Sequence, residues 1–346
     1  LEAVPKEEGK VAQIKMDPSE ESDDRLPLTV ARILVCVVLT VAFAIGIPGN
    51  AFVVWTICRR MKQRPSTVVL ILHLAVADLL VLVTMPIWIY SFAHSWVFNV
   101  VMCKALVFAV YCSMYASIFL ITALSLERFM AVFYPFAVRC WKKKVVTFLV
   151  VSGIWVLSIA FGATIIPFQE TDETEMGLQC AARRYDSNAQ EVACLLVETT
   201  VAFLIPFTII FICYVSIGRR IGRMACPSKR RSAKLIASVV VAFGLCWLPH
   251  HIFNLISVAS VLMEDSHPET SAALEKMIAI GVYVAGSVAF ISSCINPLLY
   301  AFAARNFRSS VRFVKLSRLF EQMSPSVKEA PSPNRKEETL TTVETI

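Results

Sequence analysis

Seven long apolar segments, separated by shorter polar ones, dominate the pattern of the sequence. They cover approximately residues 31–58, 67–92, 101–134, 143–167, 191–222, 230–262 and 273–303. A helix needs roughly 20 mostly apolar residues to cross the hydrocarbon core of a membrane, and each segment is long enough. The pattern therefore predicts an all-α fold, a seven-transmembrane helix bundle over residues 31–304.

The segments outside the bundle follow other patterns. Residues 1–30 are acidic and polar, and residues 321–346 are rich in Ser, Thr, Pro, Glu and Lys, so both predict disordered tails. Residues 305–320 alternate apolar and basic faces at helical spacing, which predicts a short amphipathic eighth helix in the membrane interface. No cleavable signal peptide is expected, because no basic segment with a short apolar run precedes the first helix.

Composition and charge agree with a membrane protein. Hydrophobic residues make up 57% of the chain, the mean hydropathy is +0.65 and only 17% of residues are charged, against roughly 25% in soluble proteins. Loops at 58–66, 135–144 and 219–234 carry bases, whereas those at 170–175 and 264–269 carry acids. Because cytoplasmic loops are enriched in Lys and Arg, we expect a plasma-membrane protein with its N-terminus outside and its C-terminus in the cytoplasm. The net charge of +7 reports this topology, and no nucleic-acid partner is expected.

Asp78 interrupts the apolar second segment. An ionisable residue within a membrane helix is costly and needs a partner. Polar residues at about the same depth are Asn50, Ser117, Ser293 and Asn296. One carboxylate among hydroxyl and amide oxygens suits an allosteric Na⁺ ion; a water-filled network that packs the helices is the alternative. No other cofactor is expected.

Two further patterns concern conformational change. Glu127 and Arg128 end the third helix and could pair until a partner releases the arginine, or Arg128 could simply extend to the interface. Helices two, five, six and seven contain prolines, which are either tolerated kinks or hinges: Pro86, Pro206, Pro249 and Pro297. Trp247 and Phe243, one turn apart beside Pro249, favour hinges.

Taken in order, these motifs resemble the rhodopsin-like (class A) G-protein-coupled receptors over residues 31–320. The matching residues, with at least one motif in each helix, are Gly49-Asn50, Leu74-Ala75-x-Ala77-Asp78, Cys103 with Glu127-Arg128-Phe129, Trp155, Pro206 with Tyr214, Cys246-Trp247-Leu248-Pro249 and Asn296-Pro297-Leu298-Leu299-Tyr300. The resemblance implies a receptor rather than an enzyme. It implies a disulfide between Cys103 and Cys180, a Na⁺ site at Asp78, Ser117, Ser293 and Asn296, and coupling to a heterotrimeric G protein through Glu127, Arg128, Tyr214, Trp247, Pro249, Asn296, Pro297 and Tyr300.

The resemblance also constrains the ligand. Val110 stands where amine receptors carry an aspartate, and Phe290 stands where opsins carry the retinal lysine. What remains is an apolar, aromatic cavity with few polar groups, which suits a lipid with hydroxyls or a carboxylate. The candidate ligand-binding residues are Tyr111, Met114, Tyr115, Arg183, Arg184, Glu198, His250, His251 and Asn254. The two arginines could meet an acidic head group or form a solvated loop pair. Glu198 could accept a ligand hydroxyl or stay protonated against a neighbour.

Shorter runs, among them Ser113-Met114-Tyr115-Ala116-Ser117 and Trp247-Leu248-Pro249-His250-His251, resemble the leukotriene B4 receptors. This resemblance implies leukotriene B4 as the ligand and an inhibitory, Gi-type G protein, in chemoattractant signalling. Arrestin and receptor kinases would act on the Ser- and Thr-containing C-terminal tail. Val107 and Gln169 depart from a His and an Arg of one subtype. A chemoattractant peptide receptor is the rival.

Two other functional classes are disfavoured. A seven-span transporter would predict inverted hydropathy repeats or a charged pore lining, and the sequence contains neither. A membrane enzyme would need a cluster of His with Asp, Glu or Ser at ligand spacing. The histidines of the membrane segments, His73, His250 and His251, are not expected to form one.

Overall fold

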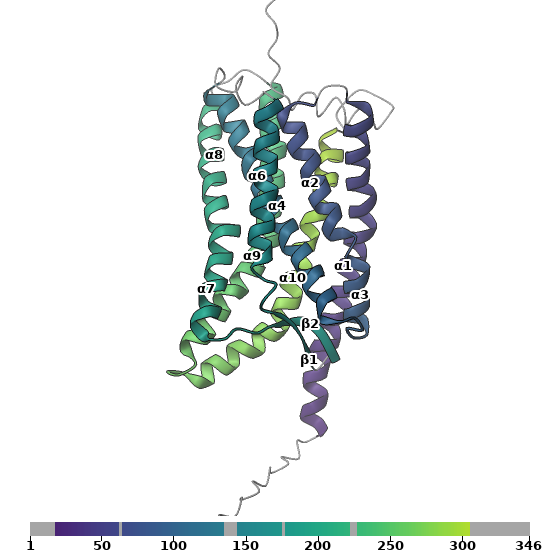
Figure 1. The fold of residues 1–346 in the computed structure, drawn as a ribbon, viewed down its shortest axis with the longest axis vertical. Coiled ribbons are helices and arrows are strands. Elements are labelled where there is room, and N and C mark those ends of the chain that lie inside the picture. Colours follow the sequence, from purple (N-terminus) through teal and green to yellow (C-terminus); the bar gives the residue numbers. More distant parts are fainter. Residues whose placement is uncertain (1–17, 62–63, 135–143, 175–176, 222–226, 305–346) are drawn as a thin grey trace, which may run out of the picture.

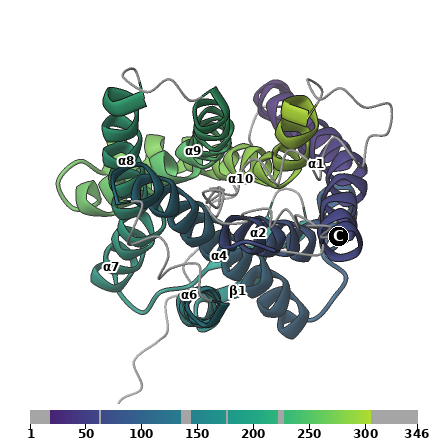
Figure 2. The same ribbon diagram turned by 90° about the horizontal axis from the view of Figure 1, so that it is seen from above.

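Seven spans that are long and apolar enough to cross a membrane form a helix bundle in the computed structural model, which describes residues 18–61, 64–134, 144–174, 177–221 and 227–304. The helices are α1 (Pro18–Arg60), α2 (Ser66–Leu82), α3 (Met85–Ala93), α4 (Val100–Phe133), α6 (Lys144–Ala163), α7 (Asn188–Thr199), η1 (Thr200–Leu204), α8 (Ile205–Ile221), α9 (Pro227–Met263) and α10 (Pro268–Ala304). They run alongside one another (Figure 1) and surround a common axis (Figure 2). The predicted seven-transmembrane bundle is confirmed. The predicted eighth helix and the C-terminal tail lie outside the described residues.

The helix boundaries follow the hydropathy pattern to within a few residues, with one larger difference. Helix α1 begins at Pro18, within the segment predicted to be a tail up to residue 30. Helices α9 and α10 likewise begin with a proline, Pro227 and Pro268. Proline is favoured at the first helical position, where its missing N–H costs no hydrogen bond and its φ is already helical. Hydropathy alone does not detect these polar first turns.

The four prolines within the spans have different effects. Pro86 lies at the start of α3, where the second span is interrupted between Leu82 and Met85. Pro206 follows η1, a single turn of π-helix. Pro249 and Pro297 lie inside α9 and α10, which continue through them. Proline cannot donate to the preceding turn and clashes with it. The second span accommodates its proline by an interruption of the helix and the fifth span has a π-helical turn before its proline, whereas the other two spans stay α-helical.

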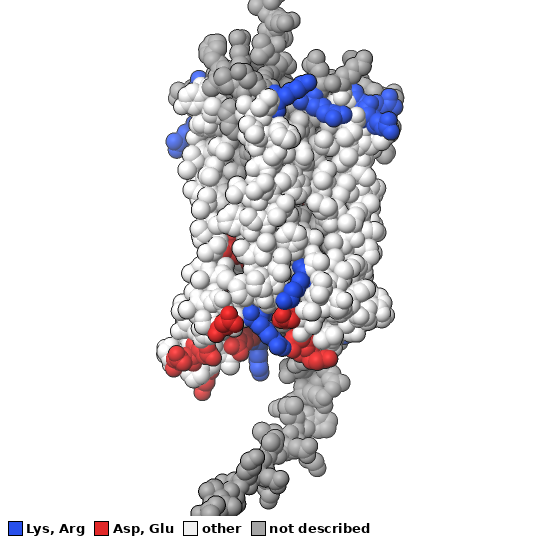
Figure 3. Space-filling view, viewed as in Figure 1, with Lys and Arg blue, Asp and Glu red and all other residues white. Residues whose placement is uncertain are grey.

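Apolar side chains cover both the inside and the outside of the bundle. Leu74, Ile118 and Leu120 are completely buried in the core, whereas Phe148 and Phe211 on the outer surface are 69% and 68% exposed. In water such a surface would be unfavourable, but in lipid it needs no cover. Figure 3 shows this belt almost free of charge between two charged ends.

The two ends differ in sign (Figure 3). The basic end carries the exposed residues Arg59, Arg60, Lys144, Arg219 and Arg220. The acidic end carries the exposed residues Asp172, Glu173, Asp186, Glu264, Asp265 and Glu269. This distribution is the one that the loop charges predict.

A β-hairpin, which the hydropathy pattern does not indicate, lies across the acidic end of the bundle (Figure 1). Strand β1 (Gln169–Thr174) pairs antiparallel with β2 (Gly177–Arg183), so that Gln169 faces Arg183. The turn places Gly177 at φ 81°, a conformation that glycine adopts without strain. The disulfide between Cys103 of α4 and Cys180 of β2 is present, as predicted. It fixes the hairpin over the mouth of the bundle.

Candidate functional site

A cavity of about 340 Å³ lies inside the bundle beneath the hairpin. Its wall is mainly apolar and aromatic, with contributions from Trp88, Phe92, Val107, Tyr111, Met114, Leu195, Trp247, Tyr283 and Phe290. Its polar lining includes Gln169, Arg183, Glu191, His250 and Asn254. A mostly apolar cavity with a few convergent polar groups is the usual form of a small-molecule site.

Glu198 of α7 organises the polar side of this cavity. Its Oε1 lies 2.7 Å from His250 Nε2 and accepts hydrogen bonds from Asn254 Nδ2 at 3.0 Å and from the Tyr111 hydroxyl at 3.4 Å. Its Oε2 lies 3.2 Å from Arg183 Nη1. Glu198 is buried, with 7% of its surface exposed. A buried charge is tolerated only when it is paired and hydrogen-bonded. One acid therefore joins β2, α4, α7 and α9.

Arg183 is the cation of this cluster. Its guanidinium lies over the Tyr111 ring, 5.3 Å from the centroid, and also donates to the Tyr111 hydroxyl. Burial alone would lower the pKa of Arg183, but the Glu198 carboxylate raises it above its usual range, so the guanidinium stays charged. The Arg183 side chain is still 21% exposed. Arg183 is therefore a cation that faces the cavity and can exchange one acidic partner for another.

The local sequence explains where Glu198 lies. Helix α7 begins at the cap residue Ser187, whose side chain accepts from the Gln190 N–H, as serine commonly does at helix starts. Glu198 is the second-last residue of α7, two residues before the start of η1 and eight before Pro206. Single π-helical turns are often found at functional sites. Here the π-turn follows directly after the residue on which the cluster is built.

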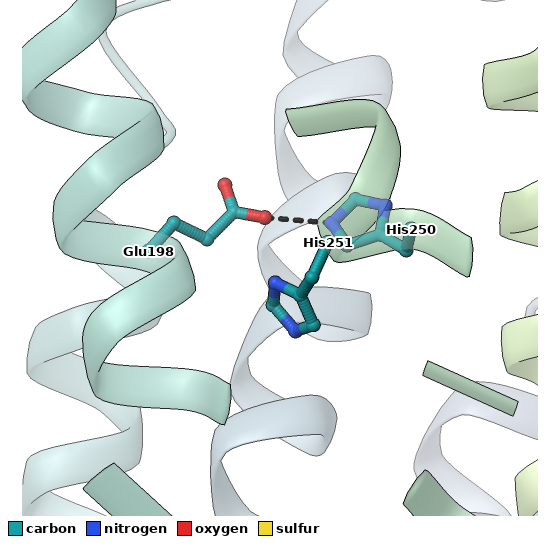
Figure 4. Close-up of side chains that lie close together, drawn as sticks. All are labelled: Glu198, His250 and His251. Atoms are coloured by element: carbon teal, nitrogen blue, oxygen red, sulfur yellow. Dashed lines mark hydrogen bonds and ion pairs between the residues drawn. The ribbon is translucent and has the colours of Figure 1, made fainter. Parts of the chain in front are cut away.

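The two histidines of α9 have different surroundings. His250 lines the cavity and bonds to Glu198, whereas His251 is 2% exposed and packs against Phe203, with ring centroids 4.9 Å apart. Glu198, His250 and His251 each offer one ligand atom, and these atoms lie within 4.8 Å of one another. Figure 4 shows the three side chains close together. The expectation that the membrane histidines form no such cluster was wrong. The acid that completes it comes from another helix, far away in the sequence.

The structure divides the predicted ligand-binding residues into two groups. Tyr111, Met114, Arg183, His250 and Asn254 line the cavity, and Glu198 lies directly behind them, bonded to four of the five. Those that do not line it are Tyr115, His251 and Arg184. Tyr115 packs instead against Phe119 and Phe161, and Arg184 is exposed and lies 3.4 Å from Asp172. Tyr185 and Glu191 also line the cavity, although neither was predicted as a ligand-binding residue. Their position shortly after Arg183 and Arg184 in the sequence could have indicated it.

The polar residues around Asp78 lie near the deep end of the cavity. Asp78 is buried and accepts hydrogen bonds from Asn296 Nδ2 at 2.9 Å and from Ser293. Ser117 and Ser293 line the cavity wall. Asn50 donates to the Ser293 carbonyl at 2.8 Å. The four predicted residues thus offer carboxylate, hydroxyl and amide oxygens, which are ligands that a hard cation accepts.

The predicted relay residues extend from the cavity to the basic end. Trp247 donates to Ser292 at 3.2 Å and packs against Phe243 at 5.8 Å between ring centroids. At the basic end Glu127 accepts from Ser66 at 2.6 Å and from Thr67 at 2.8 Å, and Arg128 donates to the same Thr67. Tyr214 packs against the core that contains Phe243. The side chain of Tyr300 lies outside the described part of the chain.

The chain is similar in sequence to known membrane receptors. The family model described as "7 transmembrane receptor (rhodopsin family)" matches residues 49–300. Leukotriene B4 receptor 1 of Homo sapiens is 33% identical over 290 residues, covering 84% of this chain and 82% of that one. The same receptor of Bos taurus is 34% identical over 292 residues, 84% and 83% of the two chains. Apelin receptor B of Danio rerio is 32% identical over 293 residues, 80% and 81%.

Proposed function

Because the chain belongs to the rhodopsin family of seven-transmembrane receptors, we propose that it binds a lipid mediator with a carboxylate and hydroxyls, leukotriene B4, and activates an inhibitory, Gi-type G protein. As a member of this family it is a multi-pass plasma-membrane receptor and not an enzyme.

The pairing of Arg183 with Glu198 at one side of an apolar cavity carries the proposal. A fatty-acid chain would fill the apolar part, where its removal from water contributes about 25 cal/mol per Å² of apolar surface. Its carboxylate would take the place of Glu198 as partner of Arg183, the cation that faces the cavity. One of its hydroxyls would donate to Glu198 Oε2, the oxygen that this exchange frees, while His250 and Asn254 stay bonded to Oε1. The similarity to leukotriene B4 receptor 1 over more than four fifths of both chains supports this choice.

The orientation follows from the two charged ends. Cytoplasmic surfaces are enriched in Lys and Arg, so the basic end faces the cytoplasm and the hairpin and cavity face outward. Glu127 and Arg128 then lie at the cytoplasmic side, where a G protein binds. Ligand entry near Trp247 would be relayed through Phe243 and the Pro249 and Pro297 segments to Arg128. Receptor kinases and arrestin would act on the tail, residues 321–346.

The resting receptor would hold Na⁺ at Asp78, Ser117, Ser293 and Asn296. Support comes from the burial of all four residues and from their oxygen-rich donor set. The ion would sit between the cavity and the Asn296–Pro297 segment. Its loss on activation would therefore link ligand binding to movement of α10.

Paired arginine variants test the lipid site. We expect Arg183→Gln to weaken leukotriene B4 binding by roughly 10–100-fold, because a charged hydrogen bond contributes about 1.5–3 kcal/mol. Arg184→Gln is the matched control, since Arg184 is exposed and lies outside the cavity lining, and it should retain the wild-type affinity. Equal loss in both variants, or in neither, would refute the assignment of Arg183.

A peptide ligand is the second candidate, since relatives of comparable identity include proteins named as apelin and C3a anaphylatoxin chemotactic receptors. The acidic end would attract a basic peptide. A panel of leukotriene B4, apelin, C3a and a formylated peptide, applied to cells that express the chain, separates the two candidates. A clear peptide response without a lipid response would replace the lipid proposal.

A further inference from the structure

Glu198, His250 and His251 form the one group of three or more potential metal-ligating side chains identified within the described residues. Each residue offers one ligand atom, and these atoms lie within 4.8 Å of one another. Figure 4 shows the carboxylate extending from α7 toward the two rings on α9. Adjacent residues of an α-helix diverge by about 100°, so the two histidines point to different sides of the carboxylate and do not stack on one another; their planes differ by 74°.

The surroundings of His251 are a second, independent observation that points to a bound ion. The residue is 2% exposed, and its Nδ1 atom is buried without a hydrogen-bond partner among the described residues. Buried polar atoms are nearly always satisfied, and an exception needs an explanation. A metal ion bound to the imidazole would supply one. The ring packs against Phe203 and Trp247, with centroids 4.9 and 6.5 Å away, so little side-chain entropy would be lost in the short inward shift that binding requires.

We propose that these three residues bind Zn²⁺, which enters from the outer side through the cavity. Imidazole nitrogen and carboxylate oxygen are preferred ligands of zinc, whereas Mg²⁺ prefers oxygen alone. Tetrahedral zinc with bonds of about 2.0–2.1 Å places its ligands roughly 3.3–3.4 Å apart. The Glu198–His250 pair, now 2.7 Å apart, would open slightly to admit the ion, and His251 would move inward. The fourth position is left for water.

The site competes directly with the ion pair described above. Zinc would neutralise Glu198 in place of Arg183. The partly exposed Arg183 side chain would then pair with Glu191, another acid on the cavity wall. Zinc would also join α7 to α9, which Glu198 already links by hydrogen bonds alone. Zinc should therefore stabilise the folded receptor without any other ligand. This inference does not depend on the lipid proposed above.

Thermal unfolding of the purified, full-length receptor in detergent tests the site, with ZnCl₂ as the only addition. We expect the apparent Tm to rise by roughly 5–10 °C at about 100 times the zinc Kd, and MgCl₂ to have no effect. His251→Phe keeps the ring packed against Phe203 but removes the ligand. This variant should raise the zinc concentration needed for half of the Tm shift by roughly 100-fold, because one of four ligands contributes about a quarter of the binding free energy.

His94→Ala is the control, because His94 is an exposed histidine at the same end of the bundle. It should respond to zinc as the wild type does. If His251→Phe does not fold, His251→Gln is measured in its place. An unshifted wild-type Tm, or a shift that survives both His251 substitutions, would overturn the proposal. Failure of leukotriene B4 to bind would leave these results unchanged, so the two proposals fail separately.

Discussion

Removal of both charges of the Arg183–Glu198 pair should destabilise the receptor by less than the sum of the two single removals. The Oε2 and Nη1 atoms lie 3.2 Å apart, and the side chains are 8% and 21% exposed. Glu198→Gln keeps the shape of the side chain but leaves the guanidinium without its acid. Arg183→Gln leaves the carboxylate with His250 and Asn254 as its remaining close partners.

The magnitude follows from burial. Loss of one partner from a fully buried pair costs about 3–5 kcal/mol. Because Arg183 is partly exposed and solvent screens the charge, we expect about 2–3 kcal/mol for either single variant. In apparent Tm this is roughly 4–10 °C. The double variant contains no unpaired charge, so a coupling energy of about 1–3 kcal/mol should separate it from the sum of the singles.

The assay is thermal unfolding of the four proteins, wild type, two singles and the double, at one scan rate, since membrane proteins often unfold irreversibly. The matched control is Arg184→Gln, which breaks the exposed 3.4 Å contact with Asp172 and should change stability by no more than about 1 kcal/mol. Additive single effects, with no coupling, would refute the assignment of Arg183 and Glu198 as a buried pair.

Three further variants test other parts of the structure. Gly162→Ala should lower stability by about 1–3 kcal/mol, because the added Cβ would lie 3.0 Å from the backbone nitrogen of Cys112 on α4. Gly153→Ala in the same helix is the control: its Cβ would meet nothing within 4 Å, so it should be neutral or stabilising. Equal Tm changes in the two variants would contradict this packing. Asp78→Asn should abolish the effect of NaCl on agonist affinity, with KCl as the control, and an undiminished Na⁺ effect would remove the proposed ion site. Arg128→Ala should retain ligand binding but lose nucleotide exchange on the G protein; full exchange would exclude Arg128 from the relay.

Hydropathy and loop charge were sufficient to predict the seven spans, because the membrane requires a continuous run of apolar residues to cross it. The interruption of the second span before Pro86 and the hairpin over the cavity were not predicted. A proline in a membrane helix is compatible with a kink, a change of helix type or a break, and the surrounding contacts decide which occurs. The hairpin residues, among them Glu170, Asp172 and Glu173, have the polarity of an ordinary loop.

The residues of the candidate site were predicted better than their contacts. Glu198 was identified as a costly acid, but its partners come from β2, α4 and α9, and no local pattern fixes which side chains meet across a bundle. The same limitation explains the error over the histidines: His250 and His251 are adjacent in the sequence, and the third ligand of their cluster lies about 50 residues earlier. Tyr115 and Arg184 were also predicted to bind the ligand, but Tyr115 packs against Phe119 and Phe161, and Arg184 is exposed beside Asp172.

The central claim is that an acidic lipid bound near Arg183 activates an inhibitory G protein. The most direct test is cyclic AMP suppression by leukotriene B4 in cells that express the wild type, Arg183→Gln or Arg184→Gln at equal surface levels. We predict suppression at nanomolar lipid for the wild type and for Arg184→Gln, with a 10–100-fold weaker response for Arg183→Gln, the loss expected for about 1.5–3 kcal/mol. No response of the wild type to the lipid, with clear suppression by a complement or formylated peptide, would contradict the claim.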